Sequence, residues 1–284
     1  MTRPSPRGGG ADARVLLITG CSSGIGHHAA HAMAARGWRV FASCRRADDC
    51  ARLEAEGLAS PLIDYERPEK IEAGLAQVLD ATGGRLDALF NNGAYAIPGL
   101  VEDLPTEALR AIFEANLFGW HDLTRRAIPA MRDRGGGRIV QNSSVLGFAA
   151  APWRGAYNAT KFALEGLTDT LRIEMRGTGI DVVLIEPGPI TSRFRANAHV
   201  QFERWIDWRA SARRDDYGPQ IRRLEDTGRG RFELPPGAVT RALVHALEAR
   251  RPRARYRVTA PTTIAAALKR ALPARTMDWI VSNS

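Results

Sequence analysis

Short apolar segments that alternate with longer helical patterns constrain the fold more than any other feature of this sequence. Segments of strand type lie at residues 14–19, 39–43, 60–63, 85–90, 138–143, 181–187 and 254–259. Helical patterns lie between them, near 25–36, 48–56, 68–81, 106–133, 157–176 and 236–249. This alternation is typical of βαβ units with helices on both faces of a parallel sheet. We therefore expect an α/β fold with a doubly wound, Rossmann-like parallel sheet in three α/β/α layers.

Residues 191–232 interrupt the alternation. They are rich in arginine and aromatic residues and show little clear periodicity. An insertion of this length in an α/β domain is usually a lid or a substrate loop. We expect a single domain over 13–284, with 191–232 as its substrate-binding lid, and a flexible Pro/Gly-rich tail over 1–12.

The positive charge of the chain does not indicate a nucleic-acid partner. There are 40 Lys+Arg against 31 Asp+Glu, but only three of the 40 are lysines, and the arginines are spread along the chain. The densest basic stretches lack the interleaved aromatic residues of single-strand binders, and no finger or helix-turn-helix spacing is present. We expect a small-molecule substrate and no nucleic acid.

Cysteine usage and hydropathy indicate a cytoplasmic protein without a transmembrane segment. The 3 cysteines match no CxxC motif, which favours a reducing compartment. No window approaches the roughly 18 apolar residues of a membrane-spanning helix. The apolar segment 264–281 also carries Lys and Arg, so peripheral membrane contact is an alternative to packing against the domain or a partner subunit. We favour packing, with Pro273 interrupting the helix.

A glycine-rich turn joins the first strand to the first helix. In TGCSSGIG (19–26), glycines at 20, 24 and 26 allow a tight turn and a close approach of backbone to a pyrophosphate. The helix that begins near Ile25 presents free N–H groups and the positive end of its dipole to that anion. The spacing is G-x-x-x-G-x-G rather than G-x-G-x-x-G. We infer a dinucleotide site.

The end of the second strand favours NADP over NAD. NAD sites usually place an acidic residue there for the ribose 2′-hydroxyl, whereas a 2′-phosphate needs positive charge. Here the strand continues into Arg45 and Arg46, with no carboxylate before Asp48. An arginine suits a fork-like contact to phosphate. The alternative is that Arg45 is an ordinary surface residue of an arginine-rich chain.

Tyr157 and Lys161 are four residues apart on a predicted helix and therefore share a face. A tyrosine phenol has a reference pKa near ~10, which a neighbouring ammonium and a cationic nicotinamide would lower. Ser144 follows the strand 138–143 at the carboxyl edge of the sheet, where doubly wound folds bind ligands. The set predicts acid–base chemistry on a substrate oxygen.

Together these motifs resemble the short-chain dehydrogenase/reductase family. TGCSSGIG (19–26) resembles its cofactor turn, NNGA (91–94) its N-N-A-G segment, and NSS (142–144) with YNATK (157–161) its S…Y-x-x-x-K core. PGPIT (187–191) resembles the P-G-x-x-T segment beside the nicotinamide. The resemblance covers roughly 14–195 in order and spacing. One departure is Gly93-Ala94, where the family usually has Ala-Gly; both residues are small, so we expect the exchange to be tolerated.

The resemblance implies catalytic roles for four residues. Tyr157 would be the general acid/base, and Lys161 would lower its pKa and bind the nicotinamide ribose. Ser144 would orient the substrate oxygen, and the backbone of Asn116 would hold a water molecule in a proton relay. The family's usual dimers and tetramers imply a homodimer or homotetramer.

The resemblance also implies the cofactor contacts. Asp64 would reach the adenine amino group, Asn92 the adenosine ribose, and Ser23 with Arg45 the 2′-phosphate. Thr191 would bind the carboxamide. The full expected cofactor set is Gly20, Ser22, Ser23, Gly24, Ile25, Gly26, Arg45, Asp64, Asn92, Tyr157, Lys161, Pro187, Gly188, Ile190 and Thr191.

Within the family, the segments 19–26, 42–46 and 157–175 resemble the hydroxysteroid and retinol dehydrogenase branch most. This implies an alcohol or ketone substrate of apolar character, bound by Ser144, Tyr157 and the lid residues Phe194, Phe202 and Trp205. The lid aromatics could instead pack the lid or a subunit interface. A ketoacyl or small-aldehyde reductase is the competing enzyme, and an NADP(H)-sensing regulatory protein the competing non-enzyme.

Three histidines cluster at the start of the first helix. His27 and His31 have the i,i+4 spacing that can bind zinc, but no third ligand and no H-E-x-x-H pattern is evident. We expect no metal there. Cys21, inside the turn, is expected to be a buried small residue rather than an oxidation sensor.

Overall fold

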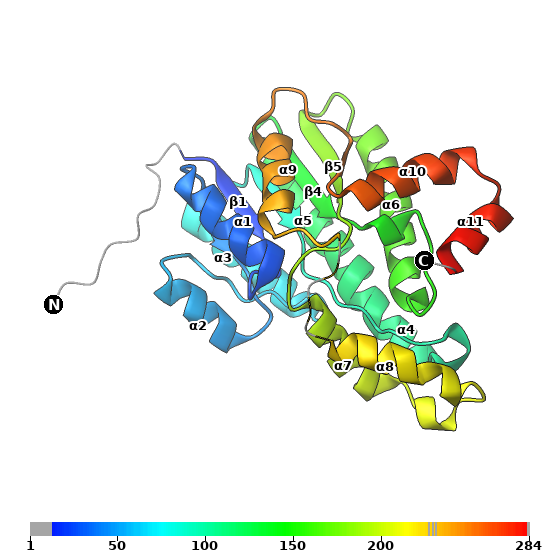
Figure 1. The fold of residues 1–284 in the computed structure, drawn as a ribbon. Coiled ribbons are helices and arrows are strands. Elements are labelled where there is room, and N and C mark those ends of the chain that lie inside the picture. Colours follow the sequence, from blue (N-terminus) through cyan, green and yellow to red (C-terminus); the bar gives the residue numbers. More distant parts are fainter. Residues whose placement is uncertain (1–12, 227, 229, 231, 283–284) are drawn as a thin grey trace.

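A six-stranded parallel sheet forms the centre of the molecule (Figure 1). The structure is a computed structural model and describes residues 13–226, 228, 230 and 232–282, so the expected tail at 1–12 lies outside the described residues. The strand order is β2-β1-β3-β4-β5-β6. The strands are β1 (Val15–Ile18), β2 (Arg39–Ala42), β3 (Ala88–Asn91), β4 (Gly137–Asn142), β5 (Ile180–Glu186) and β6 (Arg255–Arg257).

Helices cover both faces of this sheet. They are α1 (Gly24–Ala35), α2 (Ala47–Ala55), α3 (Pro68–Thr82), α4 (Thr106–Phe113), α5 (Gly119–Asp133), α6 (Gly155–Glu174), α7 (Phe194–Trp205), α8 (Tyr217–Glu225), α9 (Gly237–Glu248), α10 (Ala260–Ala271) and α11 (Ala274–Ser282), with a π-helical segment, Glu114–Phe118, between α4 and α5. Pro273 separates α10 from α11, as expected. None of the helices described is both long and apolar enough to cross a membrane.

The side chains of β1 show how the three layers form. Leu16 and Ile18 point into a core shared with α1 and α9, whereas Val15 and Leu17 point into a core shared with α3 and α5. Successive strand residues face opposite sides of a sheet, so a strand that is apolar throughout needs helices on both faces. Figure 1 shows α1 and α9 side by side over one face. The expected α/β/α architecture is confirmed.

The predicted strand at 60–63 is wrong. This segment runs beside β2 but makes only two isolated parallel bridges, Phe41 with Ala59 and Cys44 with Leu62. Pro61 lies between the two bridges and has no N–H to donate, so a continuous ladder cannot form. The segment remains an edge of the sheet without becoming a strand.

The predicted lid contains more regular structure than its sequence indicated. Helices α7 and α8 lie against each other, and the chain returns to its starting point, where Ile190 and Leu234 form an isolated bridge. The Thr191 amide donates to the Leu234 carbonyl over 2.9 Å. Phe202 and Tyr217 are buried in the interior of this excursion. The segment 191–232, predicted to be a lid, is therefore a small helical unit closed at its base.

We predict that Gly74→Ala destabilises the fold. In an open helix position this change normally stabilises by up to about 1 kcal/mol. Here a Cβ on Gly74 would overlap Ile63 Cγ1 and lie 2.8 Å from the Leu62 carbonyl oxygen, in the segment without a ladder. We expect a loss of about 1–3 kcal/mol in the free energy of unfolding, measured by urea denaturation.

The exposed neighbour in α3 supplies the control. Ala73→Gly removes only helix propensity and should cost about 1 kcal/mol. A Gly74→Ala protein at least as stable as the wild type would contradict the close packing of α3 on residues 62–63.

Candidate active site

The residues singled out from the sequence gather at the carboxyl edge of the sheet. The glycine-rich turn follows β1, Asn92 follows β3, Ser144 follows β4 and Pro187 follows β5. The chain order reverses at β1, which pairs with β2 on one side and β3 on the other. Ligands of doubly wound sheets bind in the crevice at this switch point. The expected cofactor and catalytic sets therefore share one edge.

The turn after β1 has the geometry of an anion cradle. Gly20 and Gly24 have φ values of +67° and +60°, which favour glycine. A Cβ on Gly26 would overlap the Gly20 carbonyl oxygen. The Ser23 side chain makes no capping hydrogen bond, and the first turn of α1 contains no acidic residue. The backbone N–H groups at the start of α1, which the Ser23 side chain does not cap, fit a dinucleotide pyrophosphate.

Residues 92 and 93 hold this turn against the rest of the sheet. Asn92 Nδ2 donates to the Thr19 carbonyl over 3.0 Å, and Asn142 Nδ2 donates to Asn92 Oδ1 over 2.8 Å. A Cβ on Gly20 would lie 2.5 Å from Gly93 Cα, so the two backbones touch. The small residue at 93 fits this approach, although the family usually has alanine there.

Basic residues surround the turn. Arg45 is exposed directly after β2. The pKa of Glu66 is raised by burial and by Asp64, and the positive charge of Arg45 opposes that rise. Arg52, on α2, donates to the Ser22 carbonyl over 2.7 Å. The sequence analysis missed Arg52, because only the packing of α2 beside α1 brings it back to the turn.

Tyr157 and Lys161 are both buried on α6. Ser144 Oγ accepts from the Leu146 amide over 3.1 Å, and the Ser144 side chain also acts on the pKa of Tyr157. Lys161 Nζ donates to the Asn142 carbonyl over 2.9 Å and lies 5.7 Å from the centre of the Tyr157 ring. The predicted triad is thus brought together, and Asn142 connects it to Asn92 and the turn.

Burial controls the protonation of this pair. It raises the pKa of Tyr157 above its ordinary value, and the Ser144 side chain opposes the rise. Burial also lowers the pKa of Lys161 to about 7, against the opposite effect of the Glu165 charge. The isolated site therefore holds a neutral phenol beside an ammonium that loses its proton easily.

Asn116 lies in the π-helical segment and anchors the loop after β3. Its Nδ2 donates to the Tyr95 carbonyl over 2.8 Å, and its Oδ1 accepts from the Tyr95 amide over 3.1 Å. π-Helical segments inside α-helices are frequent at functional sites. The side chain of Asn116 is therefore occupied by the loop, so any contact with a relay water would come from its backbone, as the family resemblance implies.

Trp120 is a site residue that the sequence analysis missed. It is fully buried, its Nε1 donates to the Gly93 carbonyl over 2.8 Å, and Lys161 Nζ lies 4.1 Å from its ring centre. A cation over an indole face is stabilised by the ring quadrupole. In the sequence, only the four-residue spacing between Asn116 and Trp120 indicated that Trp120 could face the same site as Asn116.

The segment after β5 leads into the lid. The Pro187 carbonyl accepts from the Val145 amide over 2.8 Å, and a Cβ on Gly188 would overlap Thr259 Oγ1. Ile190 pairs with Leu234 in an isolated bridge, and the Thr191 amide donates to the Leu234 carbonyl, so these residues close the base of the predicted lid. These contacts place the expected nicotinamide segment beside Ser144.

Of the expected substrate aromatics, Phe194 lies against Tyr157. Its ring centre lies 5.4 Å from that of Tyr157. Phe202 is buried, with its ring 6.0 Å from Tyr217 inside the lid, and Trp205 donates from Nε1 to Gln201 Oε1. Phe194 therefore lies at the edge of the sheet that holds Tyr157. Phe202 packs inside the segment 191–232, which agrees with the alternative that these aromatics pack the predicted lid.

Arg154 precedes α6 and places a cation near the site. It is half-buried, and burial lowers its pKa to about 10, with the charges of Arg223 and Arg195 acting in the same direction. Its Nη1 donates to the Trp153 carbonyl over 3.1 Å. A guanidinium surrounded by other cations attracts an anionic group.

A carboxylate network lies behind Lys161. Arg255 contacts Glu165, Asp169 and Glu186 at 3.1, 2.6 and 2.9 Å. Burial raises the pKa of Glu165 to about 7. The Glu186 charge adds to the rise, and the hydrogen bond from Arg255 opposes it. Burial also acts to raise the pKa of Asp169, but hydrogen bonds from Arg255 and Arg172 hold it below its ordinary value.

We predict that Glu165→Gln changes the pH dependence of stability. The folded chain keeps the Glu165 proton up to about pH 7, whereas an unfolded glutamate loses it near pH ~4.3. The free energy of unfolding therefore falls as the pH rises through this window. Urea denaturation at several pH values should show a smaller fall in the variant.

Asp169→Asn is the matched control. Asp169 also contacts Arg255, but its pKa is lowered and so lies below the pH range in which Glu165 loses its proton. It should keep the wild-type slope between these pH values. Equal slopes for wild type and Glu165→Gln would contradict the raised pKa.

Comparison with known proteins agrees with this geometry. The chain is 40% identical over 269 residues to the uncharacterized oxidoreductase YbbO of Escherichia coli K12, covering 94% of each chain. It is 34% identical to human retinol dehydrogenase 8 (66% of this chain, 62% of that one) and 30% identical to an NADPH-dependent 3-dehydrocapnine reductase of Ornithobacterium rhinotracheale (94% and 95%). The expected likeness to the hydroxysteroid and retinol branch is confirmed.

A solved structure and a family model lead to the same conclusion. The crystal structure of a short-chain dehydrogenase from Streptomyces avermitilis superposes with a TM-score of 0.75, at 28% identity, over 96% of this chain and 97% of that one. The model of the family described as short chain dehydrogenase matches residues 14–201. The chain therefore belongs to the short-chain dehydrogenase/reductase family of oxidoreductases.

Proposed function

We propose that the protein is an NADP(H)-dependent oxidoreductase that interconverts an apolar alcohol and its ketone or aldehyde. The observation that carries the proposal is the buried Tyr157, placed beside Lys161 and influenced by Ser144 at the edge that holds the glycine-rich turn. An acid–base residue, a group for the substrate oxygen and an anion cradle meet there.

The proposed chemistry assigns one task to each side chain. Ser144 binds the substrate oxygen, and Tyr157 donates a proton to it during reduction or removes one during oxidation. Lys161 stabilises the phenolate by its charge, and the backbone of Asn116 holds the water that returns the proton. The nicotinamide, when bound, supplies or accepts the hydride.

The choice of NADP rests on positive charge at the turn. Arg45 precedes α2, Arg52 lies on α2 and donates to the Ser22 carbonyl, and Ser23 directly precedes α1. A relative that covers nearly the whole chain is named as NADPH-dependent. We further propose that Asp64 and Asn92 bind the adenosine, and Ile190 and Thr191 the carboxamide.

The apolar substrate is supported by the lid. We propose that 191–232 closes over the substrate, because the ring of Phe194 contacts that of Tyr157. A relative of the same branch is named for retinol. We also propose self-association, since Phe118, Phe162 and Ile173 expose apolar surface on the π segment and α6, which lie in contact.

A second candidate is a ketoacyl reductase. Arg154 favours it, because an acidic group on the substrate or its carrier would neutralise that half-buried cation. Assay of NADPH oxidation with paired ketones, one neutral and one carrying a carboxylate or thioester, separates the candidates. Turnover of bulky neutral ketones alone supports the first, and turnover of the acidic or thioester members alone supports the second.

We predict that Tyr157→Phe lowers kcat by about 10²–10⁴-fold, because the proton donor is lost while the ring remains. NADPH binding, followed by cofactor fluorescence, should stay close to wild type. Tyr256→Phe is the control: its hydroxyl contacts His245, away from the turn, and its loss should leave kcat unchanged. Retained turnover in Tyr157→Phe would exclude the proposed mechanism. If the wild-type protein binds NADPH tightly but turns over none of the ketones, the result would favour the alternative of an NADP(H)-sensing regulatory protein.

We predict that Arg45→Asp shifts cofactor preference from NADPH toward NADH by at least about tenfold in kcat/KM, because a carboxylate repels the 2′-phosphate and accepts a ribose hydroxyl. Arg110→Asp makes the same charge change on α4, where Arg110 pairs with Glu107. That control should leave the preference unchanged. An unaltered NADPH/NADH ratio in Arg45→Asp would assign the preference to other residues.

A further inference from the structure

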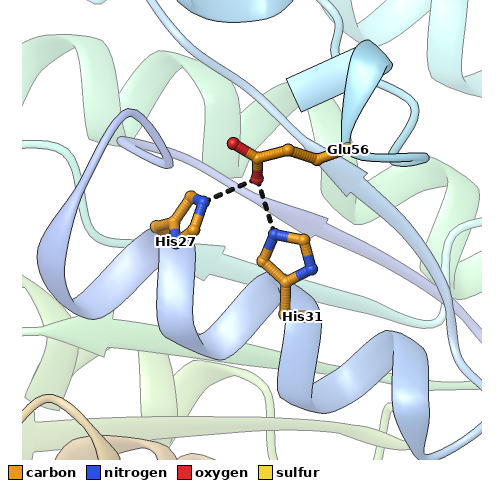
Figure 2. A group of neighbouring side chains, drawn as sticks. All are labelled: His27, His31 and Glu56. Carbon is orange, nitrogen blue, oxygen red and sulfur yellow. Dashed lines mark hydrogen bonds and ion pairs between the residues drawn. The ribbon is translucent and has the colours of Figure 1, made fainter. Parts of the chain in front are cut away.

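Two histidines on α1 and a glutamate at the end of α2 lie close together in the space between these two helices. His27 and His31 lie one helical turn apart on α1, and Glu56 follows the last residue of α2. Figure 2 shows both imidazoles pointing toward one carboxylate oxygen. His27 Nε2 lies 2.6 Å and His31 Nε2 lies 2.7 Å from Glu56 Oε2.

This arrangement supplies the third group that the sequence analysis did not find. Glu56 is 25 residues from His31, and only the packing of α2 beside α1 brings it there. The ligand atoms of the three residues all lie within 4.8 Å of one another. Two imidazole nitrogens and a carboxylate oxygen are a common ligand set of zinc, which binds them at about 2.0–2.2 Å.

The surroundings leave the three ligand atoms available. Arg52 is the cation beside Glu56, but its Nη1 lies 3.8 Å from Oε1, the oxygen that does not face the histidines. The adjacent His28 points elsewhere, with Nδ1 2.8 Å from Thr240 Oγ1. The side chains of His27, His31 and Glu56 are 33%, 41% and 30% exposed, so an ion can enter from solvent.

We propose that His27, His31 and Glu56 form a binding site for Zn²⁺ that is separate from the catalytic centre. The ion takes the two Nε2 atoms and Oε2, and water completes its tetrahedron. Each imidazole gives up its Nε2 proton, which moves to Nδ1 when the ring is neutral and to solvent when it is charged. No electron transfer is involved. The bound ion joins α1 to α2 and thereby holds Arg52 beside the turn.

The test uses the full-length protein without a histidine tag, so that no added histidine cluster competes for the ion. The protein is first treated with a chelator to remove bound metal. Zinc chloride is titrated by calorimetry, and Co²⁺ is added separately to report ligand geometry by visible absorption. We expect one Zn²⁺ per chain, a Co²⁺ spectrum of four-coordinate type, and a rise in melting temperature with Zn²⁺. The three cysteines of the chain are buried and should not contribute.

Single variants decide the assignment. His27→Gln, His31→Gln and Glu56→Gln should each weaken Zn²⁺ binding by at least about tenfold and abolish the Co²⁺ spectrum. His199→Gln is the matched control, because His199 also faces a glutamate, Glu203 at 3.7 Å, but without a second histidine beside it. Zn²⁺ affinity that is the same in His31→Gln as in the wild type, or the absence of saturable binding by the wild type, would overturn the proposal. Because these readouts need no turnover, they do not depend on the proposed oxidoreductase activity.

Discussion

The buried ammonium of Lys161 is the interaction on which the site depends. It donates to the Asn142 carbonyl, lies over the Trp120 ring and stands beside Tyr157. Asn142 in turn donates to Asn92, whose side chain holds the turn after β1. A charge removed from water is tolerated only where surrounding dipoles replace its hydration. The groups that stabilise Lys161 therefore also connect β4, β3 and β1 at the ligand-binding edge.

The choice of lysine at this position follows from its chemistry. The chain has 40 basic residues of which only three are lysines, so arginine is its ordinary cation. A guanidinium keeps its proton and suits planar partners, as the partly buried Arg255 shows with three carboxylates around it. A compact ammonium fits between an indole face and a phenol, and its pKa responds to burial. That response is the property which an acid–base site uses.

Much of the fold and the turn could be predicted from the sequence, because both depend on local patterns. Alternating strands and helices define the layers, and glycine is required where φ is positive or where backbones touch, as at Gly20. The strand at 60–63 was mispredicted because Pro61 removes one donor from an otherwise strand-like segment. The helices of the lid were missed because their inward residues, such as Phe202 and Tyr217, are outnumbered by surface arginines.

Residues that act through tertiary contacts were not predictable in this way. Arg52, Glu56 and Trp120 carry no motif, and each matters because of an element that lies beside it in space. Arg52 and Glu56 are four residues apart at the end of α2, so one helix presents a cation to the Ser22 carbonyl and a carboxylate to α1. The position of α2 thus sets both the charge at the cofactor turn and the distance between Glu56 and the histidines. A change that moves α2 should affect the two together, which would link the turn after β1 to the proposed zinc site through a single helix.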